Sequence, residues 1–181
     1  MAVIKDAAPA VGTKAPAFSL PDTDAVVHSL GSAPATVVVF TCNHCPYALG
    51  WHERIIAVAQ EYAQRGVQML AINPNDATRY AGDSVDAMRD RVRAGEFDGV
   101  PYLRDESQEV ARAYDAKTTP DVFVIDEDGV IRYRGAPDSD LEDASQNAAW
   151  IRGALDAVLA GRDPDPVETP PVGCTVKWRE A

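Results

Sequence analysis

Two cysteines in the first quarter of the chain have the spacing with the clearest chemical meaning. Cys42 and Cys45 are separated by two residues, in the stretch Cys42-Asn43-His44-Cys45. Across one helical turn the second sulfur can reach the first, so Cys45 can expel a partner bound to Cys42 and leave an intramolecular disulfide. The sequence therefore predicts thiol–disulfide exchange, in which only the thiolate form of a cysteine attacks.

The surroundings of the pair predict an acidic thiol. A buried strand stops just before Cys42 and a helix begins just after Cys45, so we expect the Cys42 sulfur to meet the unpaired N–H groups and positive dipole end of the helix. The second thiol and a protonated His44 would stabilise the same thiolate, which predicts a pKa of Cys42 below the ~8.5 of a free cysteine. Asn43 and Thr41 flank the pair as further tuning residues, and a solvated loop position is the alternative for His44.

Two other roles are open to the cysteine pair. Buried cysteines often act as small hydrophobic residues, although a pair at the mouth of a parallel sheet is unusual in that role. A zinc site needs two further ligands, and no second Cys-x-x-Cys or His-x-x-x-His supplies them. The remaining candidates are Cys174, His28, His44 and His52. The sequence therefore favours a dithiol site that requires no metal or organic cofactor.

The elements that must position the pair follow a strand–helix–strand order. Residues 36–40 are a continuous β-branched and aromatic run, which predicts a central strand covered on both faces. From Pro46 to Gly66, apolar residues recur at three- and four-residue spacing, which predicts an amphipathic helix closed by a glycine. Residues 67–72 predict a second buried strand. A right-handed crossover between the two strands makes the sheet at least partly parallel.

The rest of the chain predicts smaller elements around this unit. Half-apolar pieces on both sides of the turn at residues 21–24 predict a hairpin, and residues 121–125 and 130–135 predict another. Helices are expected at residues 83–94, 108–114 and 148–159, with a short strand at residues 100–103. We expect an N-terminal arm over residues 1–10, one domain over residues 11–161 and a tail over residues 162–181.

The composition excludes several functional classes. The chain has 181 residues, 46% hydrophobic and 25% charged, which is typical of a soluble protein with one core. Its formal net charge of −11 and pI near 4.6 argue against nucleic acids and anionic membranes as partners, because phosphates would be repelled. No apolar run approaches the ~20 residues that span a bilayer. The start of the chain also lacks a basic region followed by an apolar stretch, so we expect a cytoplasmic protein.

A second motif lies directly before the predicted strand at residues 121–125. The stretch Lys117-Thr-Thr-Pro120 puts a proline, which cannot donate to a strand ladder, at the opening of a central strand. A cis peptide bond between Thr119 and Pro120 would supply the local geometry, although trans is the commoner state of such bonds.

The two motifs together resemble the thioredoxin-like superfamily, and the opening at residues 12–22 is similar to its redoxin branch. That branch contains the alkyl hydroperoxide reductase/thiol-specific antioxidant family and related thiol–disulfide oxidoreductases. The resemblance covers residues 11 to about 161. It implies an α/β thioredoxin-like fold, with a central mixed sheet flanked by helices. It also implies that Cys42 attacks, that Cys45 resolves, and that a cis Thr119-Pro120 bond holds the backbone of a partner.

The sequence departs from this family at several positions. Thr41 replaces the common tryptophan before the first cysteine, and Thr36 replaces a buried carboxylate, so no proton acceptor for Cys45 is identified. In peroxiredoxins a threonine lies three residues before the peroxidatic cysteine. The residue three before Cys42 is Val39, so the peroxidase motif is broken. The candidates for the arginine of that motif are Arg104, Arg132 and Arg134.

The function that this sequence predicts is a thiol–disulfide oxidoreductase acting on dithiol or disulfide proteins or on small thiols. The first alternative is a peroxiredoxin-like peroxidase that reduces hydroperoxides, and the second is a non-catalytic binding module. Cys174, in the tail, is a candidate third redox thiol or an inert one. Its position depends on where Val172, Val176 and Trp178 anchor the tail.

Overall fold

The computed structural model describes residues 9–180, so the expected arm over residues 1–10 falls almost wholly outside the described part of the chain. Five strands form the central sheet in the order β5-β4-β3-β7-β8. They are β3 (Ala35–Phe40), β4 (Gln68–Asn73), β5 (Tyr102–Arg104), β7 (Asp121–Asp126) and β8 (Ile131–Gly135). β4 is parallel to β3 and β5, whereas β7 is antiparallel to β3 and β8. The predicted mixed sheet is confirmed.

Side-chain alternation along β3 explains why both faces of the sheet are covered. Val37 and Val39 belong to one hydrophobic core, and Val38 and Phe40 belong to the other, because successive residues of a strand point to opposite faces. Every residue of β3 is buried. A strand with apolar side chains on both faces must be packed against other elements on both faces. The continuous apolar run at residues 36–40 predicted this arrangement.

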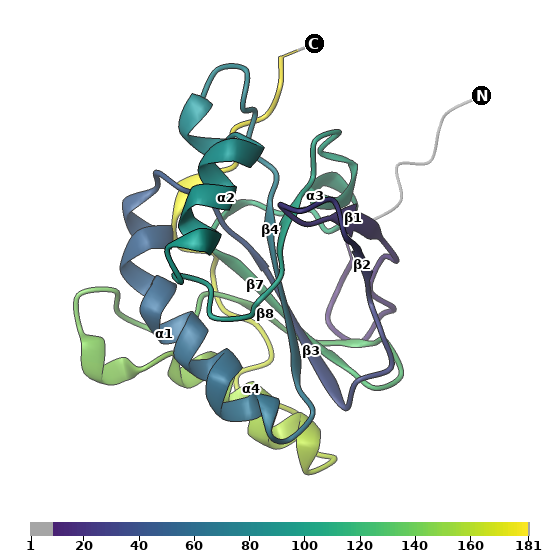
Figure 1. Ribbon diagram of the computed structural model, residues 1–181. Helices are drawn as coiled ribbons and strands as arrows, with labels where there is room; N and C mark the ends of the chain where they lie inside the picture. Colours follow the sequence, from purple (N-terminus) through teal and green to yellow (C-terminus); the bar gives the residue numbers. More distant parts are fainter. Residues whose placement is uncertain (1–8, 181) are drawn as a thin grey trace.

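Helices and a hairpin provide this cover (Figure 1). One face carries α1 (Pro46–Ala63) and α4 (Ala149–Leu159), and the other carries α3 (Glu109–Ala113) and the antiparallel hairpin of β1 (Ser19–Pro21) and β2 (Val27–Ser29). Two short 3-10 turns are η1 (Ala81–Asp83) and η2 (Ala144–Gln146). Within residues 9–180, no helix is long and apolar enough to cross a lipid bilayer.

The helix predicted from Asp83 begins two residues later. α2 spans Val85–Arg93 and follows the turn η1. Ser84 is its N-cap, because the Ser84 hydroxyl accepts a hydrogen bond from the amide of Ala87 at 3.2 Å. Because Ser84 caps the helix, the side chain of Asp83 is not the cap, and it is buried inside the protein.

The C-terminal tail returns to the domain. Its strand β9 (Cys174–Thr175) pairs with β6 (Thr118–Thr119), and the tail crosses the molecule as the yellow segment of Figure 1. Of the three expected anchors, Val176 is buried and Trp178 packs under the guanidinium of Arg112, 4.4 Å from the ring centroid. Val172 is exposed, so its predicted anchoring role is wrong: it precedes β9 and lies outside both hydrophobic cores.

Candidate active site

The cysteine pair lies in the loop that joins β3 to α1. Thr41 is buried, and its amide donates to the carbonyl of Ile72 in β4 at 2.8 Å, which fixes the start of the loop against the sheet. Cys45 is the N-cap residue of α1, and Pro46 is the first residue of the helix. Proline suits this position because its missing N–H would have no partner within the helix. The loop is therefore held at both ends.

The peptide bond between Thr119 and Pro120 is cis, as predicted, and it faces the pair. The Thr119 hydroxyl lies 3.3 Å from Cys42 Sγ. The Thr119 carbonyl lies 3.2 Å from Cys45 Sγ and accepts a hydrogen bond from that thiol when it is protonated. Residues that are far apart in the sequence are thus brought together as the resemblance implied.

All three cysteines of the chain meet at this point. Cys42 and Cys45 are 1% and 0% exposed and form a small cluster with Ala48, against which the half-buried Cys174 packs. All three are free thiols. The structure therefore places the candidate third thiol at the pair itself.

The acidic thiol of the pair is Cys45, so the expectation that Cys42 has a lowered pKa is wrong. The hydrogen bond between the two thiols is the largest cause of both shifts. It lowers the pKa of Cys45 to about 4, and it raises the pKa of Cys42, which burial raises further. Cys174 and the amide of Ala48 also lower the pKa of Cys45. Because α1 begins at Pro46, its N-terminus lies at Cys45 and not at Cys42.

The lowered pKa of Cys45 predicts how the reduced protein responds to pH. Its thiolate absorbance should persist below neutral pH and disappear near pH 4. The folded pKa lies below the reference value of 9.0, so the thiolate's contribution to stability is complete above pH 9 and is lost as pH falls towards about 4. The measurement is urea unfolding of wild type and Cys45→Ala from pH 9 to 5, in which the difference between the two should shrink. A thiolate that titrates near the ordinary pKa would contradict the prediction.

A buried carboxylate, Asp83, organises the other side of the loop. It is 0% exposed. It accepts hydrogen bonds from the amide of Asn43 at 2.7 Å, and from the side-chain amides of Asn73 at 3.0 Å and Asn75 at 3.1 Å. His44 Nδ1 lies 2.6 Å from Asp83 Oδ2. These donors compensate the buried charge, as a carboxylate without water requires.

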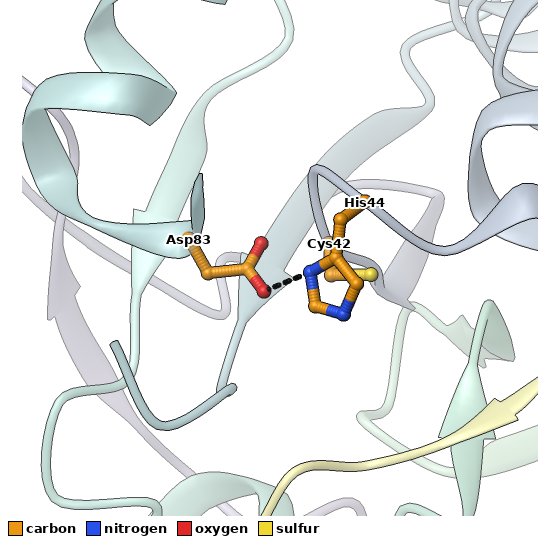
Figure 2. Close-up of side chains that lie close together, drawn as sticks. All are labelled: Cys42, His44 and Asp83. Atoms are coloured by element: carbon orange, nitrogen blue, oxygen red, sulfur yellow. Dashed lines mark ion pairs between the residues drawn. The ribbon is translucent and has the colours of Figure 1, made fainter. Parts of the chain in front are cut away.

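The ion pair holds His44 beside Cys42 (Figure 2). Cys42 Sγ, a ring nitrogen of His44 and a carboxylate oxygen of Asp83 all lie within 4.8 Å of one another. The imidazole also stacks on Tyr80, with an interplanar angle of 4° and ring centroids 5.4 Å apart. His44 is thus an exposed loop residue whose imidazole is held next to the thiol by Asp83 and Tyr80.

The same three side chains have donor atoms that a divalent metal ion could use. Asp83 Oδ1 already accepts hydrogen bonds from Asn43 and Asn73, and Asp83 Oδ2 accepts one from Asn75 and pairs with His44. An ion would have to displace this arrangement. The geometry therefore fits the positioning of His44 against Cys42 better than metal binding.

Asn43 fixes the loop through its side chain. Its Oδ1 accepts hydrogen bonds from the Tyr102 hydroxyl at 2.7 Å and from Arg91 Nη1 at 2.8 Å. Its Nδ2 donates to the carbonyl of Gly82 at 2.9 Å. This tuning residue therefore acts on the shape of the loop, and none of these contacts involves a sulfur.

The three arginines suggested for a peroxidase site lie elsewhere. Arg104 donates to backbone carbonyls behind Asp83. Arg132 pairs with two aspartates, and Arg134 donates to two backbone carbonyls and lies over Phe123. The sequence could not place these side chains because β5 and β8 are far from the cysteines along the chain.

Two carboxyl groups near the site were not identified from the sequence. Asp83 stood at a predicted helix start, where acidic residues are common, so nothing indicated that its side chain turns inward. Asp121 follows the cis bond and is 1% exposed, and burial raises its pKa to about 6. Its Oδ1 has no hydrogen-bond partner among residues 9–180. An acidic residue opening an apolar strand was the available signal for Asp121.

Comparison with known proteins supports this architecture. The family model described as Redoxin matches residues 10–149. A solved structure of an uncharacterized conserved protein from Geobacillus kaustophilus is 37% identical, with a TM-score of 0.88 over 95% of this chain and 94% of that chain. No functionally curated protein matches the chain.

More distant solved structures share the fold. A protein described as the thiol:disulfide interchange protein DsbE, from Chlorobium tepidum, is 21% identical, with a TM-score of 0.67 over 84% of this chain and 99% of that chain. Peroxidoxin BcpB from Mycobacterium tuberculosis is 18% identical, with a TM-score of 0.60 over 84% of this chain and 97% of that chain. At these identities the likeness shows a common thioredoxin-like fold alone.

Proposed function

Because this chain belongs to the redoxin family, we propose that it is a thiol–disulfide oxidoreductase in which Cys42 and Cys45 form the reactive dithiol. The observation that carries the proposal is that the two free thiols are buried together at the start of α1, each in contact with Thr119 of the cis Thr119-Pro120 bond. One acidic thiol and one adjacent thiol are what disulfide exchange through an intramolecular disulfide requires.

The arrangement supports a balanced exchange with a disulfide partner. Cys42 attacks one sulfur of the partner as it gives up its proton, and the partner's S–S bond breaks. The partner's other sulfur leaves with that proton, while Cys45 remains a thiolate. Cys45 then attacks the Cys42 sulfur, releases the bound partner as a thiolate and leaves a Cys42–Cys45 disulfide. Two electrons have passed to the partner.

His44 is the side chain that supports the attacking thiol, and Asp83 holds it in place. A protonated imidazole beside Cys42 favours its thiolate as the proton leaves. Asp83 sets the direction of the ring, and its own charge raises the pKa of Cys42. His44 is therefore proposed to offset the carboxylate's effect on Cys42.

The proposal is tested by reduction of a disulfide substrate. With dithiothreitol as the electron source, catalytic amounts of the protein should accelerate the reduction of insulin, and the oxidised protein should contain a Cys42–Cys45 disulfide by peptide mapping. No acceleration over dithiothreitol alone, with both thiols remaining alkylatable after oxidation, would overturn the proposal and leave a binding module.

A thiol peroxidase is the second candidate, favoured by one observation. Cys174 packs against Cys45, and a thiol in this position could resolve a sulfenic acid formed on Cys45 by a hydroperoxide. Stopped-flow mixing with hydrogen peroxide separates the candidates. Fast peroxide consumption with a trapped sulfenic acid would favour the peroxidase, and slow consumption with fast insulin reduction would favour the oxidoreductase.

A further inference from the structure

The tail forms a strand beside the cis peptide bond. In the antiparallel ladder of β6 and β9, Thr118 pairs with Thr175 and Thr119 pairs with Cys174. Gly173 makes the close approach possible, because a Cβ at this position would lie 2.4 Å from the Thr119 carbonyl oxygen. The tail therefore occupies the backbone position in which the proposed function would hold a partner.

Contacts after β9 fix the position of the tail. The Lys177 amide donates to Asn75 Oδ1 at 2.9 Å, and its carbonyl accepts from the Asp76 amide at 2.9 Å and from Gln108 Nε2 at 2.9 Å. Asn75 and Gln108 are buried polar residues. Asn75 also binds Asp83, so the tail is joined to the network that holds His44.

The tail also covers the reactive pair. Val176 is buried in the second hydrophobic core, and Cys174 packs against Cys42, Cys45 and Ala48. The neighbouring Cys174 thiol is one of the groups that lower the pKa of Cys45. A thiol in contact with one member of a dithiol pair is an exchange partner for it.

We propose that Cys174 is a third redox thiol, held by the docked tail as an internal exchange partner for Cys45. This inference rests on the proposed function, which supplies the Cys42–Cys45 disulfide. The Cys174 thiolate attacks the Cys45 sulfur, the Cys42–Cys45 bond breaks, and a Cys45–Cys174 bond forms. Cys42 leaves as a thiolate, and the proton lost by Cys174 passes to solvent. No electrons are gained or lost, so no further oxidant is required.

The exchange gives the tail a role in the reaction cycle. While Cys45 is bonded to Cys174, Cys42 is a free thiol and the tail is covalently closed over Thr119. Reduction of this bond, or reversal by Cys42, removes the covalent link and leaves the tail held by its non-covalent contacts alone, which a partner can displace. The oxidised protein therefore exists as two interconverting disulfide forms.

The test is disulfide mapping in Cys42→Ser. Treated with oxidised glutathione, this variant should form a mixed disulfide on Cys45, which Cys174 then resolves. Alkylation, digestion and mass spectrometry should find most of the protein with a Cys45–Cys174 bond and no glutathione. Glutathione retained on Cys45, with Cys174 alkylatable, would overturn the inference.

A second pair of variants separates docking from chemistry and remains informative if Cys42→Ser does not fold. With Cys42 intact, Gly173→Val should displace β9, abolish the Cys45–Cys174 form and leave the Cys42–Cys45 form. The neighbouring Val172→Ala, at an exposed position, should map as wild type, with both forms present. If wild type and Val172→Ala contain the Cys42–Cys45 form alone, the inference is wrong.

Failure of the inference is distinguishable from failure of the proposed function. Wild type and Val172→Ala, whose substitution lies at an exposed position, should both accelerate insulin reduction. If both do so while the Cys45–Cys174 form is never found, the inference alone is wrong. If neither reduces insulin, the proposed function is wrong.

Discussion

Replacement of Cys42 with serine in a Cys174→Ser background, where Cys45 has no second thiol to exchange with, is expected to reduce the rate of insulin reduction to that of dithiothreitol alone. A serine hydroxyl does not form the sulfur anion that attacks a disulfide. Cys45→Ser should behave differently, because Cys42 can still attack but the mixed disulfide is not resolved by its neighbour. In the Cys174→Ser background, non-reducing gels and mass spectrometry should show insulin trapped on Cys42 in Cys45→Ser and none trapped on Cys45 in Cys42→Ser.

This comparison also tests the direction of the exchange. Since the resting thiolate lies on Cys45, the alternative is that Cys45 attacks the partner itself. The partner would then be trapped on Cys45 in Cys42→Ser/Cys174→Ser and absent from Cys45→Ser/Cys174→Ser. Equal insulin reduction by wild type and both variants would remove the dithiol from the mechanism altogether.

Local patterns predicted the frame of the site well. The apolar run at residues 36–40, the helix that follows Pro46 and the cis bond before Pro120 were all evident because each depends on a few neighbouring residues. The pKa of Cys42 was predicted wrongly by the same kind of reasoning. The helix was predicted to begin at Pro46, as it does, but the largest cause of both pKa shifts is the interaction between the two thiols, and burial raises the pKa of Cys42 further.

Contacts between distant segments account for what the sequence did not reveal. Asp83 binds the amide of Asn43, which is 40 residues away along the chain, and neither residue belongs to a recognisable motif. β9 has two residues and no hydrophobic alternation of its own. It forms because Gly173 permits close approach and because buried side chains such as Gln108 hold the segment that follows. Such pairings depend on the completed fold.

Asp83→Ala is expected to lower the free energy of unfolding by about 3 kcal/mol or more, because several buried donors lose their acceptor at a cost of about 1–3 kcal/mol each. The Asp83 carboxylate accepts hydrogen bonds from the side-chain amides of Asn73 and Asn75 and from the backbone amide of Asn43. Without it, these donors would be left with no acceptor away from water. Urea unfolding of the reduced protein measures the effect. The matched control is Asp86→Ala, whose exposed carboxylate pairs with Arg89 on the surface.

The control should change stability by less than about 0.5 kcal/mol, because exposed pairs contribute little. Asp83→Asn keeps the size of the side chain and one acceptor oxygen. An NH2 group replaces Oδ2, however, and faces two nitrogens, Asn75 Nδ2 and His44 Nδ1, that now lie against this oxygen. Its loss of stability should lie between those of the other two variants. If Asp83→Ala were as stable as Asp86→Ala, the carboxylate would not be the group that holds the loop, and His44 would lose its assigned position beside Cys42.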